Sequence, residues 1–331
     1  AARCAGRRMG CCVTAGATVP FANVLSASSR PEAIGRSSAP TAGGIAMTDS
    51  TPGVFLLGVG AQKAGTSWLH QQLHQRSDAD FGFLKEYHIH DALTIPKLER
   101  FRHLNVQLTK PRSWLQPRSW RRQRFFSDPR RYYNYFAWLL RRPRRPNRTV
   151  CLTGDITPSY AVLSADTFRG IHNQFQQRGI PVRPVFLLRD PIERIISSQR
   201  MKLRKQGQRD AATEVASLRH RVQKGQGLRS NYSPTLQALD QSFGLEHCFI
   251  GLFETLFQQD SYAALCDYLE ITYQEPDWQT KVNASATTNQ IPDDLLAELG
   301  DQQAADFQQV CKALPQMDFA KLWPTTSRWC S

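Results

Sequence analysis

The sequence predicts an α/β fold with a central parallel sheet, and three short apolar runs carry this prediction. Residues 54–57, 150–152 and 184–188 are rich in β-branched and aromatic side chains, which is typical of buried strands. Each run is followed by a loop with glycine, proline or hydroxyl residues and then by apolar residues at helical spacing. The 331 residues, 41% of them hydrophobic, suffice for one large α/β domain or two small ones. The apolar runs are strand-sized, so no membrane span is expected.

The first 46 residues differ from the rest of the chain. They are rich in Ala, Gly, Ser and Arg, contain one acidic residue, Glu32, and show no sustained periodicity. Three interpretations fit this composition: a disordered tail, a transit peptide, or sequence translated upstream of a start at Met47. We predict a single folded domain over 47–331. We also predict a cytoplasmic location, which a transit peptide would change.

Three of the eight cysteines lie in that first segment, and the other five are scattered. None of them has the spacing of a metal site, so free thiols in a reducing compartment are predicted and no metal is expected. The sequence leaves open whether Cys311 and Cys330 form a disulfide.

The first predicted strand leads into a loop suited to bind a phosphate. Residues 54–73 read as strand, glycine-containing loop and helix, with Lys63 in the loop. Backbone N–H groups, the helix dipole and the lysine would all favour an anion there. A Walker A motif needs lysine directly after its second glycine, but Gly65 is followed by Thr66 and the lysine precedes it. This register argues against a nucleotide kinase. The alternative is an ordinary turn whose glycines serve only the backbone.

A lysine, a carboxylate and an imidazole follow closely in the stretch 81–88. We expect this stretch to be extended, which places Glu86 and His88 on one side and Lys85 on the other. A carboxylate beside an imidazole suits a general base that deprotonates a hydroxyl. The alternative is a surface Lys–Glu pair with a nearby histidine.

The segment 97–148 is strongly basic. It holds 16 Lys and Arg against 2 acidic residues, an excess of 14 that equals the net charge of the whole chain, +14. Aromatic residues are interleaved, and 132–140 reads as an amphipathic helix. Basic and aromatic side chains together suit a polyanion, either nucleic acid or an acidic saccharide or lipid. The alternative is a solvated insertion.

The second predicted strand, 150–152, is followed by the sequence Gly-Asp-Ile-Thr-Pro-Ser-Tyr at 154–160. Pro158 and the hydroxyl residues fit a strand-to-helix loop that lines a site. Asp155 could mimic a Walker B aspartate, although the Walker A lysine is missing. A helix is predicted from Ser164 to near Gly179.

The third strand, 184–188, ends directly before Arg189. Asp190 fits a helix cap and Pro191 a first helical position, so Ser197 lies about two turns into the next helix. The carboxyl ends of parallel strands face the ligand crevice of such a sheet. Arg189 and Ser197 can therefore both reach one phosphate.

Two of these motifs resemble the cofactor-binding motifs of sulfotransferases that use 3'-phosphoadenosine 5'-phosphosulfate (PAPS). They are Lys63 with the Gly-Thr-Ser-Trp at 65–68, and the Arg-Asp-Pro…Ser segment at 189–197. The stretch 85–88 looks like the Lys-Glu-x-His of heparan-sulfate-type and related bacterial members, and 154–160 is similar to their Glu-x-[Ser/Thr]-Pro-x-Tyr segment. The resemblance covers roughly 54–254, including a helix and strand within 231–256.

The resemblance implies a P-loop-like three-layer α/β/α fold and transfer of a sulfonyl group from PAPS, with adenosine 3',5'-bisphosphate as product and no metal. Lys63 would neutralise the bridging oxygen of the phosphosulfate, and Glu86 would be the general base beside Lys85 and His88. Arg189 and Ser197 would bind the 3'-phosphate. The implied cofactor-binding set is Gln62, Lys63, Ala64, Gly65, Thr66, Ser67, Trp68, Arg189 and Ser197.

We expect a carbohydrate or glycolipid acceptor that offers a hydroxyl or amine, held by the Arg-rich segment if it is anionic. No specific nucleic acid is then expected. The rival interpretation is a nucleic-acid-binding P-loop-like protein that uses the same segment. The chain departs from the family at Ile156, where heparan-type members often carry lysine, and 281–285 is only a weak candidate for their C-terminal 3'-phosphate loop.

Overall fold

The structure is a computed structural model that describes residues 53–102, 117–142, 149–208, 210–225, 231–280, 282 and 290–329. These residues belong to one compact unit, which spans Thr41–Ser331. The segment 1–46 and, apart from Val282, the candidate loop at 281–285 lie outside the described residues. The domain start at Met47 therefore stays a prediction.

Five parallel strands form the central sheet, in the order β2-β3-β1-β4-β5. They are β1 Val54–Gly60, β2 Ala79–Asp80, β3 Leu152–Ile156, β4 Val182–Leu188 and β5 Phe249–Leu252. β1 is buried along its whole length and pairs with two neighbours, so that Phe55 lies opposite Thr153 on one side and Val182 on the other. The predicted α/β class with a parallel sheet is confirmed.

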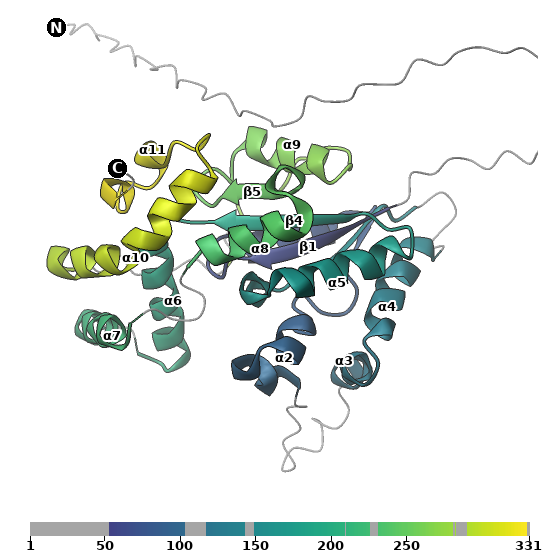
Figure 1. Cartoon of the computed structure of the whole chain (residues 1–331), viewed down its shortest axis with the longest axis horizontal. Coiled ribbons are helices and arrows are strands. Elements are labelled where there is room, and N and C mark those ends of the chain that lie inside the picture. The colour runs from purple at the N-terminus through teal and green to yellow at the C-terminus, as the bar shows by residue number, and fades with distance from the viewer. Residues whose placement is uncertain are drawn as a thin grey trace, which may run out of the picture. The chain divides into compact units, whose positions relative to one another are not determined.

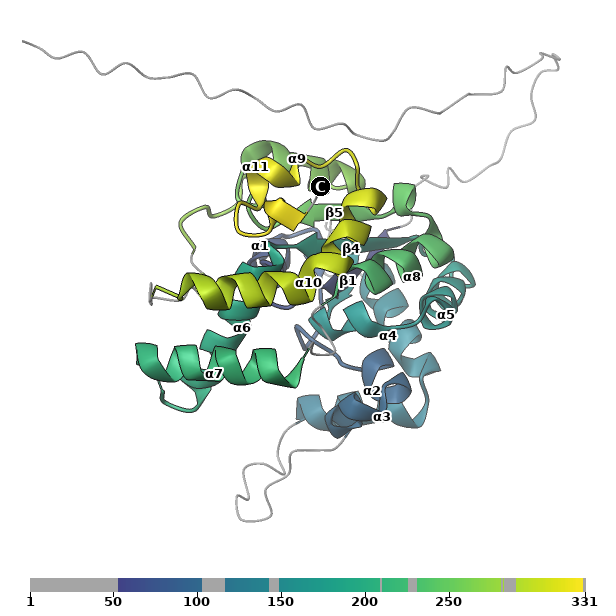
Figure 2. The same ribbon diagram turned by 60° about the vertical axis from the view of Figure 1, so that its left-hand side comes forward.

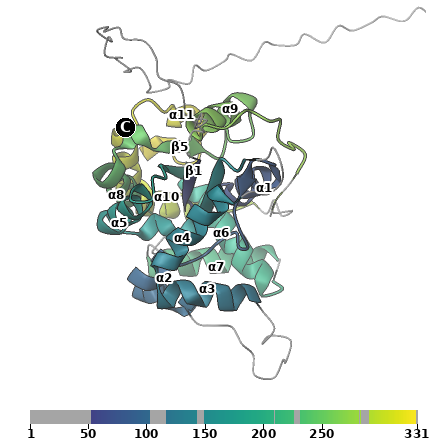
Figure 3. The same cartoon turned by 90° about the vertical axis from the view of Figure 1, so that its right-hand side faces the viewer.

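Helices cover both faces of this sheet (Figures 1 and 3). On one face, Phe55 stacks on Phe175 of α5 (Ala165–Gln176) at 3.9 Å between ring centroids and meets Phe136 of α4 (Arg130–Arg141) at 5.0 Å. α8 (Ser233–Phe243) packs beside α5. On the other face, Trp68 of α1 (Thr66–Gln75) contacts Tyr262 of α9 (Gln259–Tyr268). The predicted three layers are therefore present.

A second group of helices lies beside the sheet, and Figure 2 shows α10 running along α6 and α7. These helices are α6 Pro191–Lys205, α7 Ala211–Lys224 and α10 Asp293–Ala313. Ile192, Leu218 and Leu295 contribute to a small hydrophobic core between them. The remaining helices are α2 His90–Thr94, α3 Pro117–Ser127 and α11 Phe319–Leu322. In the described part of the chain, no helix has the length and apolar character to cross a membrane.

The local predictions are confirmed in part. Helices occur where 132–140 and Ser164 predicted them, and the Ser164 hydroxyl accepts a hydrogen bond from Thr167 N at 3.3 Å. β3 begins at Leu152 rather than Val150, so most of the predicted 150–152 strand is not strand. The expected extended stretch at 81–88 is wrong: β2 ends at Asp80, and a turn follows at Gly82 with φ +73°.

Cys151, Cys248 and Cys266 carry free thiols, as predicted. Cys311 is disulfide-bonded, which departs from the expectation of free thiols throughout. Cys330 lies outside the described residues, so whether it is the partner of Cys311 stays open, as it was from the sequence.

Candidate active site

The residues singled out from the sequence gather at one edge of the sheet. Because all strands are parallel, the carboxyl ends of β1, β3 and β4 lie side by side. The loop 60–65 follows β1, Thr157 follows β3, and Arg189 follows β4. This edge is the ligand-binding edge of an open parallel sheet.

Local backbone contacts shape the loop between β1 and α1. Ala61 N donates to Leu187 O at 2.7 Å, and Ala64 N donates to Ala61 O at 3.2 Å. Lys63 and Gly65 both have left-handed backbone conformations, with φ of +72° and +88°. A Cβ at Gly65 would also overlap the Leu256 side chain, so the position requires glycine.

The N-terminus of α1 is open to an anion. Gly65 is its N-cap, no side chain caps the helix, and no acidic residue lies in its first turn. The first N–H groups of a helix have no intrahelical acceptor and carry the positive end of its dipole. Thr66, Ser67 and Trp68 therefore present the backbone donors that were predicted. The Ala64 N–H is bonded within the loop, so its predicted place in the cofactor-binding set stays a prediction.

The side chains of Gln62 and Trp68, both in the predicted cofactor-binding set, have contrasting surroundings. Gln62 is half-buried in the loop. Trp68 is buried, with its indole stacked on Trp278 at 5.9 Å and an interplanar angle of 20°. Its ring therefore belongs to the packing of α1 against Tyr262 of α9 and Trp278 beyond that helix, and only its backbone faces the loop.

Lys63 stands among other cations. Burial lowers the pKa of its ammonium group, and the positive charges of Arg204, Arg189 and Lys85 lower it further. Within the described residues, no carboxylate pairs with Lys63. Such a cluster of like charges is stabilised by a bound anion. Arg204, near the end of α6, was not foreseen from the sequence, which gives no signal for it beyond its helix.

Arg189 reaches the same loop. Its Nη1 lies 3.4 Å from Lys63 O, its Nη2 lies 3.4 Å from Glu193 Oε2, and its guanidinium covers the Phe253 ring at 4.4 Å. Ser197 is buried on α6, two turns further along. Arg189 thus lies against the loop that carries Lys63, while its joint binding of one phosphate with Ser197 stays a prediction.

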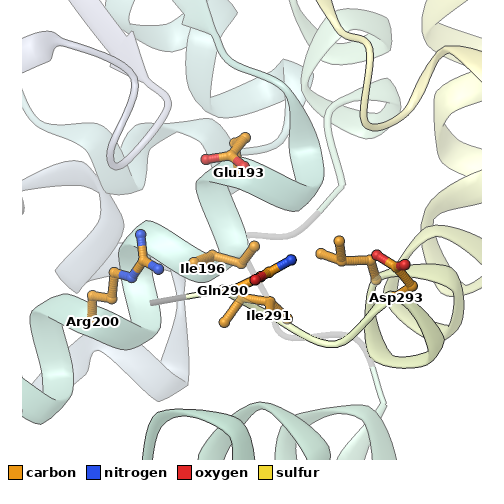
Figure 4. Close-up of a pocket in the computed structure, with 7 residues that line it drawn as sticks. Glu193, Ile196, Arg200, Gln290, Ile291 and Asp293 are labelled. Atoms are coloured by element: carbon orange, nitrogen blue, oxygen red, sulfur yellow. The ribbon is translucent and has the colours of Figure 1, made fainter. Parts of the chain in front are cut away.

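A hollow of about 310 Å³ opens between α6 and the start of α10 (Figure 4). Figure 4 shows Glu193, Arg200 and Asp293 among its lining side chains. Arg200 is already paired with Glu214 at 2.6 Å. Two carboxylates and one engaged guanidinium do not favour a phosphate, so the hollow is not the anion site.

The stretch after β2 carries the predicted catalytic side chains. Lys85 Nζ donates to Ser67 Oγ at 2.7 Å and to Glu86 Oε1 at 2.8 Å, and Glu86 Oε2 lies 3.3 Å from His88 Nε2. Lys85, Glu86 and His88 therefore lie together at the helix N-terminus. The prediction that Lys85 faces away from Glu86 is wrong, because the chain turns here instead of running as a strand.

Two further residues complete this cluster. Asp91 Oδ2 lies 2.7 Å from His88 Nδ1, and Ser159 Oγ donates to the same carboxylate oxygen. Both were missed; the available signals were the three-residue spacing between His88 and Asp91 and the hydroxyl in the 154–160 loop. Burial opposes protonation of His88, but Asp91 and Glu86 raise its pKa to about 9. Burial alone would raise the pKa of Glu86, but His88 and Lys85 lower it to about 2.

The loop after β3 holds the catalytic stretch in place. Tyr87 N donates to Thr157 Oγ1 at 3.0 Å, and Ile89 N donates to the Tyr160 hydroxyl at 3.3 Å. The loop therefore lies against the stretch that carries Lys85, Glu86 and His88, as a loop that lines the site would. Asp155 accepts hydrogen bonds from the Tyr160 and Tyr132 hydroxyls at 2.7 and 3.0 Å, and burial raises its pKa to about 6. Asp155 is thus a buried structural residue and no Walker B equivalent.

The fold and this edge define a P-loop-like α/β protein with an uncapped helix N-terminus and an adjacent Lys-Glu-His cluster. Neither a protein-family model nor a curated protein sequence matches the chain. Its structure is similar to a sulfotransferase from Alicyclobacillus acidocaldarius, with 18% identity and a TM-score of 0.53 over 81% of this chain and 98% of that chain. The chain therefore has the fold of a sulfotransferase.

Two weaker similarities are to sulfotransferase domains. One is from the Synechococcus PCC 7002 olefin synthase, with 13% identity and a TM-score of 0.40 over 76% of this chain and 94% of that one. The other is from the curacin biosynthetic pathway, with 16% identity and a TM-score of 0.39 over 72% and 81%. The comparisons give no support to the nucleic-acid-binding alternative.

Proposed function

We propose that the protein is a sulfotransferase that transfers a sulfonyl group from PAPS to a hydroxyl or amine of its acceptor. The observation that carries the proposal is the convergence of Lys63, Lys85 and Arg189 on an uncapped helix N-terminus, directly beside the Glu86 carboxylate. The sulfotransferase fold supports it.

The residues present fit this cofactor. Bound PAPS supplies a sulfonyl group on a leaving phosphate. The N–H groups of Thr66 and Ser67 would hold the 5'-phosphate, and Lys63, which has no carboxylate partner in the described residues, would neutralise the bridging oxygen. Arg189 and Ser197 would hold the 3'-phosphate. Fixed donors and cations at developing negative charge lower the barrier without reorganisation.

Glu86 would take the proton of the acceptor. A carboxylate with a pKa near 2 is a weak base, so it takes the proton late, after the acceptor atom has begun to bond to sulfur and become acidic. Lys85 and His88 hold both oxygens of Glu86 and fix its direction. The acceptor–sulfur bond forms as the sulfur–phosphate oxygen bond breaks, and the proton ends on Glu86.

The acceptor would be an anionic carbohydrate or glycolipid, bound along a row of aromatic rings and guanidinium groups. The row begins at Phe83, two residues before Lys85. The Arg121 guanidinium lies 5.2 Å from the Phe83 ring centroid, and the Tyr135 ring lies 5.4 Å from it. Trp138, 50% exposed, stacks on Tyr135 at 6.0 Å.

Arg142 ends this row: its guanidinium lies 4.4 Å from the Trp138 ring centroid and is paired with Asp80, so Arg121 is the exposed guanidinium of the row. Ring faces stack on sugar rings, and guanidinium groups bind carboxylates or sulfates in pairs of hydrogen bonds. The row thus connects an exposed platform on α3 and α4 with the Lys-Glu-His cluster. An anionic saccharide on the platform could extend a hydroxyl to Glu86.

Calorimetric titration of the full chain with adenosine 3',5'-bisphosphate tests the cofactor assignment. We expect micromolar or tighter binding that Arg189→Ala weakens by about 10- to 100-fold, the value of a charge-assisted hydrogen-bond pair. Adenosine 5'-monophosphate lacks the 3'-phosphate, so its affinity should change little in that variant. Arg169→Ala, an exposed position on α5, is the matched control. The absence of any binding to the folded wild-type protein would refute the proposal.

A further inference from the structure

The ring of Phe101 lies flat against the imidazole of His88. The two ring centroids are 3.9 Å apart, and the planes differ by 6°. Phe101 belongs to a short 3-10 helix, Pro96–Arg102, that opens the Arg-rich segment. A bulky side chain thus covers one face of the imidazole within the Lys-Glu-His cluster.

Arg122 of α3 holds Phe101 in turn. Its Nη2 donates a hydrogen bond to Phe101 O, and its guanidinium lies 5.5 Å from the Phe126 ring centroid. Burial lowers the pKa of Arg122, and the nearby Asp91 carboxylate opposes that effect. Arg122 is half-buried, unlike its neighbour Arg121, so its position serves an internal contact.

The contacts of His88 divide into two kinds. The bonds to Asp91 and Glu86 lie at the two ring nitrogens, so they fix the imidazole within its own plane. Bonds at the ring edge restrain less well a small tilt of the ring plane, which the side-chain torsions allow. A flat neighbour at van der Waals distance restrains that tilt. His88 also has a left-handed backbone, with φ +53°, which side-chain contacts must offset.

We propose that Phe101, held by Arg122, is a positioning residue that fixes the tilt of His88 and, through it, the direction of the Glu86 carboxylate. We call this contact of Phe101, held by Arg122, with His88 the clamp. The catalytic role of Glu86 rests on the proposed function, but the clamp itself does not. The Arg-rich segment 97–148 would then position the Lys-Glu-His cluster through Phe101 near its start and hold the acceptor on α3 and α4.

An NMR titration of the His88 imidazole in the full chain tests the clamp without any substrate, with His88→Asn to assign its signals. The charged groups that face this imidazole are Glu86 and Asp91, with Arg122 behind Asp91 and Arg100 5.2 Å from the Phe101 ring centroid. Since a ring face stabilises the imidazolium and its aligned hydrogen bonds, Phe101→Leu should increase the acid dissociation constant of His88 about threefold or more.

Phe101→Tyr should restore the wild-type titration. Arg122→Lys keeps the positive charge but lacks the guanidinium that reaches Phe101 O, so it should produce a smaller change in the same direction. Arg124→Lys, at an exposed arginine on the same helix, should change nothing. If Phe101→Leu fails to fold, Arg122→Lys decides alone. A titration of His88 that is the same in wild type, Phe101→Leu and Arg122→Lys would overturn the clamp. Failure of the sulfotransferase proposal would instead appear as absent bisphosphate binding with this titration unaffected.

Discussion

The loop 60–67 and the stretch 85–91 lie side by side but are built differently. The loop 60–67 is shaped mainly by its own backbone and one neighbouring strand, through the bonds of Ala61 and Ala64, and the side chains of Arg189 and Lys85 add one bond each. The stretch 85–91 is held almost wholly by side chains from distant parts of the chain, including Thr157, Tyr160 and Phe101. We call the loop a backbone device, because backbone conformation sets its shape, and the stretch 85–91 a side-chain device, because side-chain contacts set its shape.

This difference teaches which changes each region tolerates. A backbone device depends on conformations that only glycine adopts easily, so it should fail when a Cβ is added. A side-chain device depends on hydrogen bonds and stacked rings, so it should lose function in graded steps as partners are removed. The following predictions separate the two.

The largest effect is expected for Lys63→Ala, which removes the cation from the loop but leaves its backbone intact. We expect release of sulfate from PAPS, measured without added acceptor, to fall about 10²- to 10³-fold, because leaving-group charge is no longer neutralised. Lys205→Ala, exposed at the end of α6, is the control. A loss below tenfold would assign the loop's contribution to its N–H groups alone.

Gly65→Ala is expected to have the next largest effect. The left-handed conformation costs about 1–2 kcal/mol for a residue with a Cβ, and the Leu256 side chain must also move. We expect urea unfolding to show that loss and calorimetry to show bisphosphate affinity reduced by tenfold or more.

Gly179→Ala is a matched control for this change. Gly179 also has a left-handed backbone, with φ +67°, but a Cβ there would meet no atom within 4 Å. It should lose about 1–2 kcal/mol of stability from the backbone conformation alone and keep its affinity for the bisphosphate. Equal losses of affinity in the two variants would show that the loop acts through general stability rather than through its shape.

The same difference explains what could be predicted from the sequence. The strand, loop and helix around Lys63 and the cap of α6 are local, so glycine spacing and Pro191 sufficed to predict them. The bent course of 81–88 was missed because a turn at Gly82 and bonds to Thr157, 70 residues away, determine it. Alternation alone cannot anticipate such contacts.

The positions of the charged side chains in the structure also could not be predicted from the sequence. The count of basic residues in 97–148 indicated an anionic partner, but Arg122 proves to bond a backbone carbonyl inside the protein. Arg204 lies outside that segment and yet acts on Lys63. Which guanidinium faces a site depends on how helices cross, and this is a property of packing rather than of composition.

The smallest effect is expected for Trp138→Ala, at the exposed end of the row of rings and guanidinium groups that begins at Phe83. Its ring is half exposed and Arg142 retains its ion pair with Asp80, so Trp138→Ala should leave the free energy of unfolding within about 0.5 kcal/mol. Affinity for a hyaluronan hexasaccharide, an anionic saccharide probe, should fall about three- to fivefold, since one stacked ring is lost. Trp120→Ala, also 50% exposed on α3 but outside the row, is the control. Because the row acts through side chains, the loss of affinity should be partial and sensitive to salt. Equal losses at Trp120 and Trp138 would mean that the whole basic surface, and not this row, attracts the saccharide.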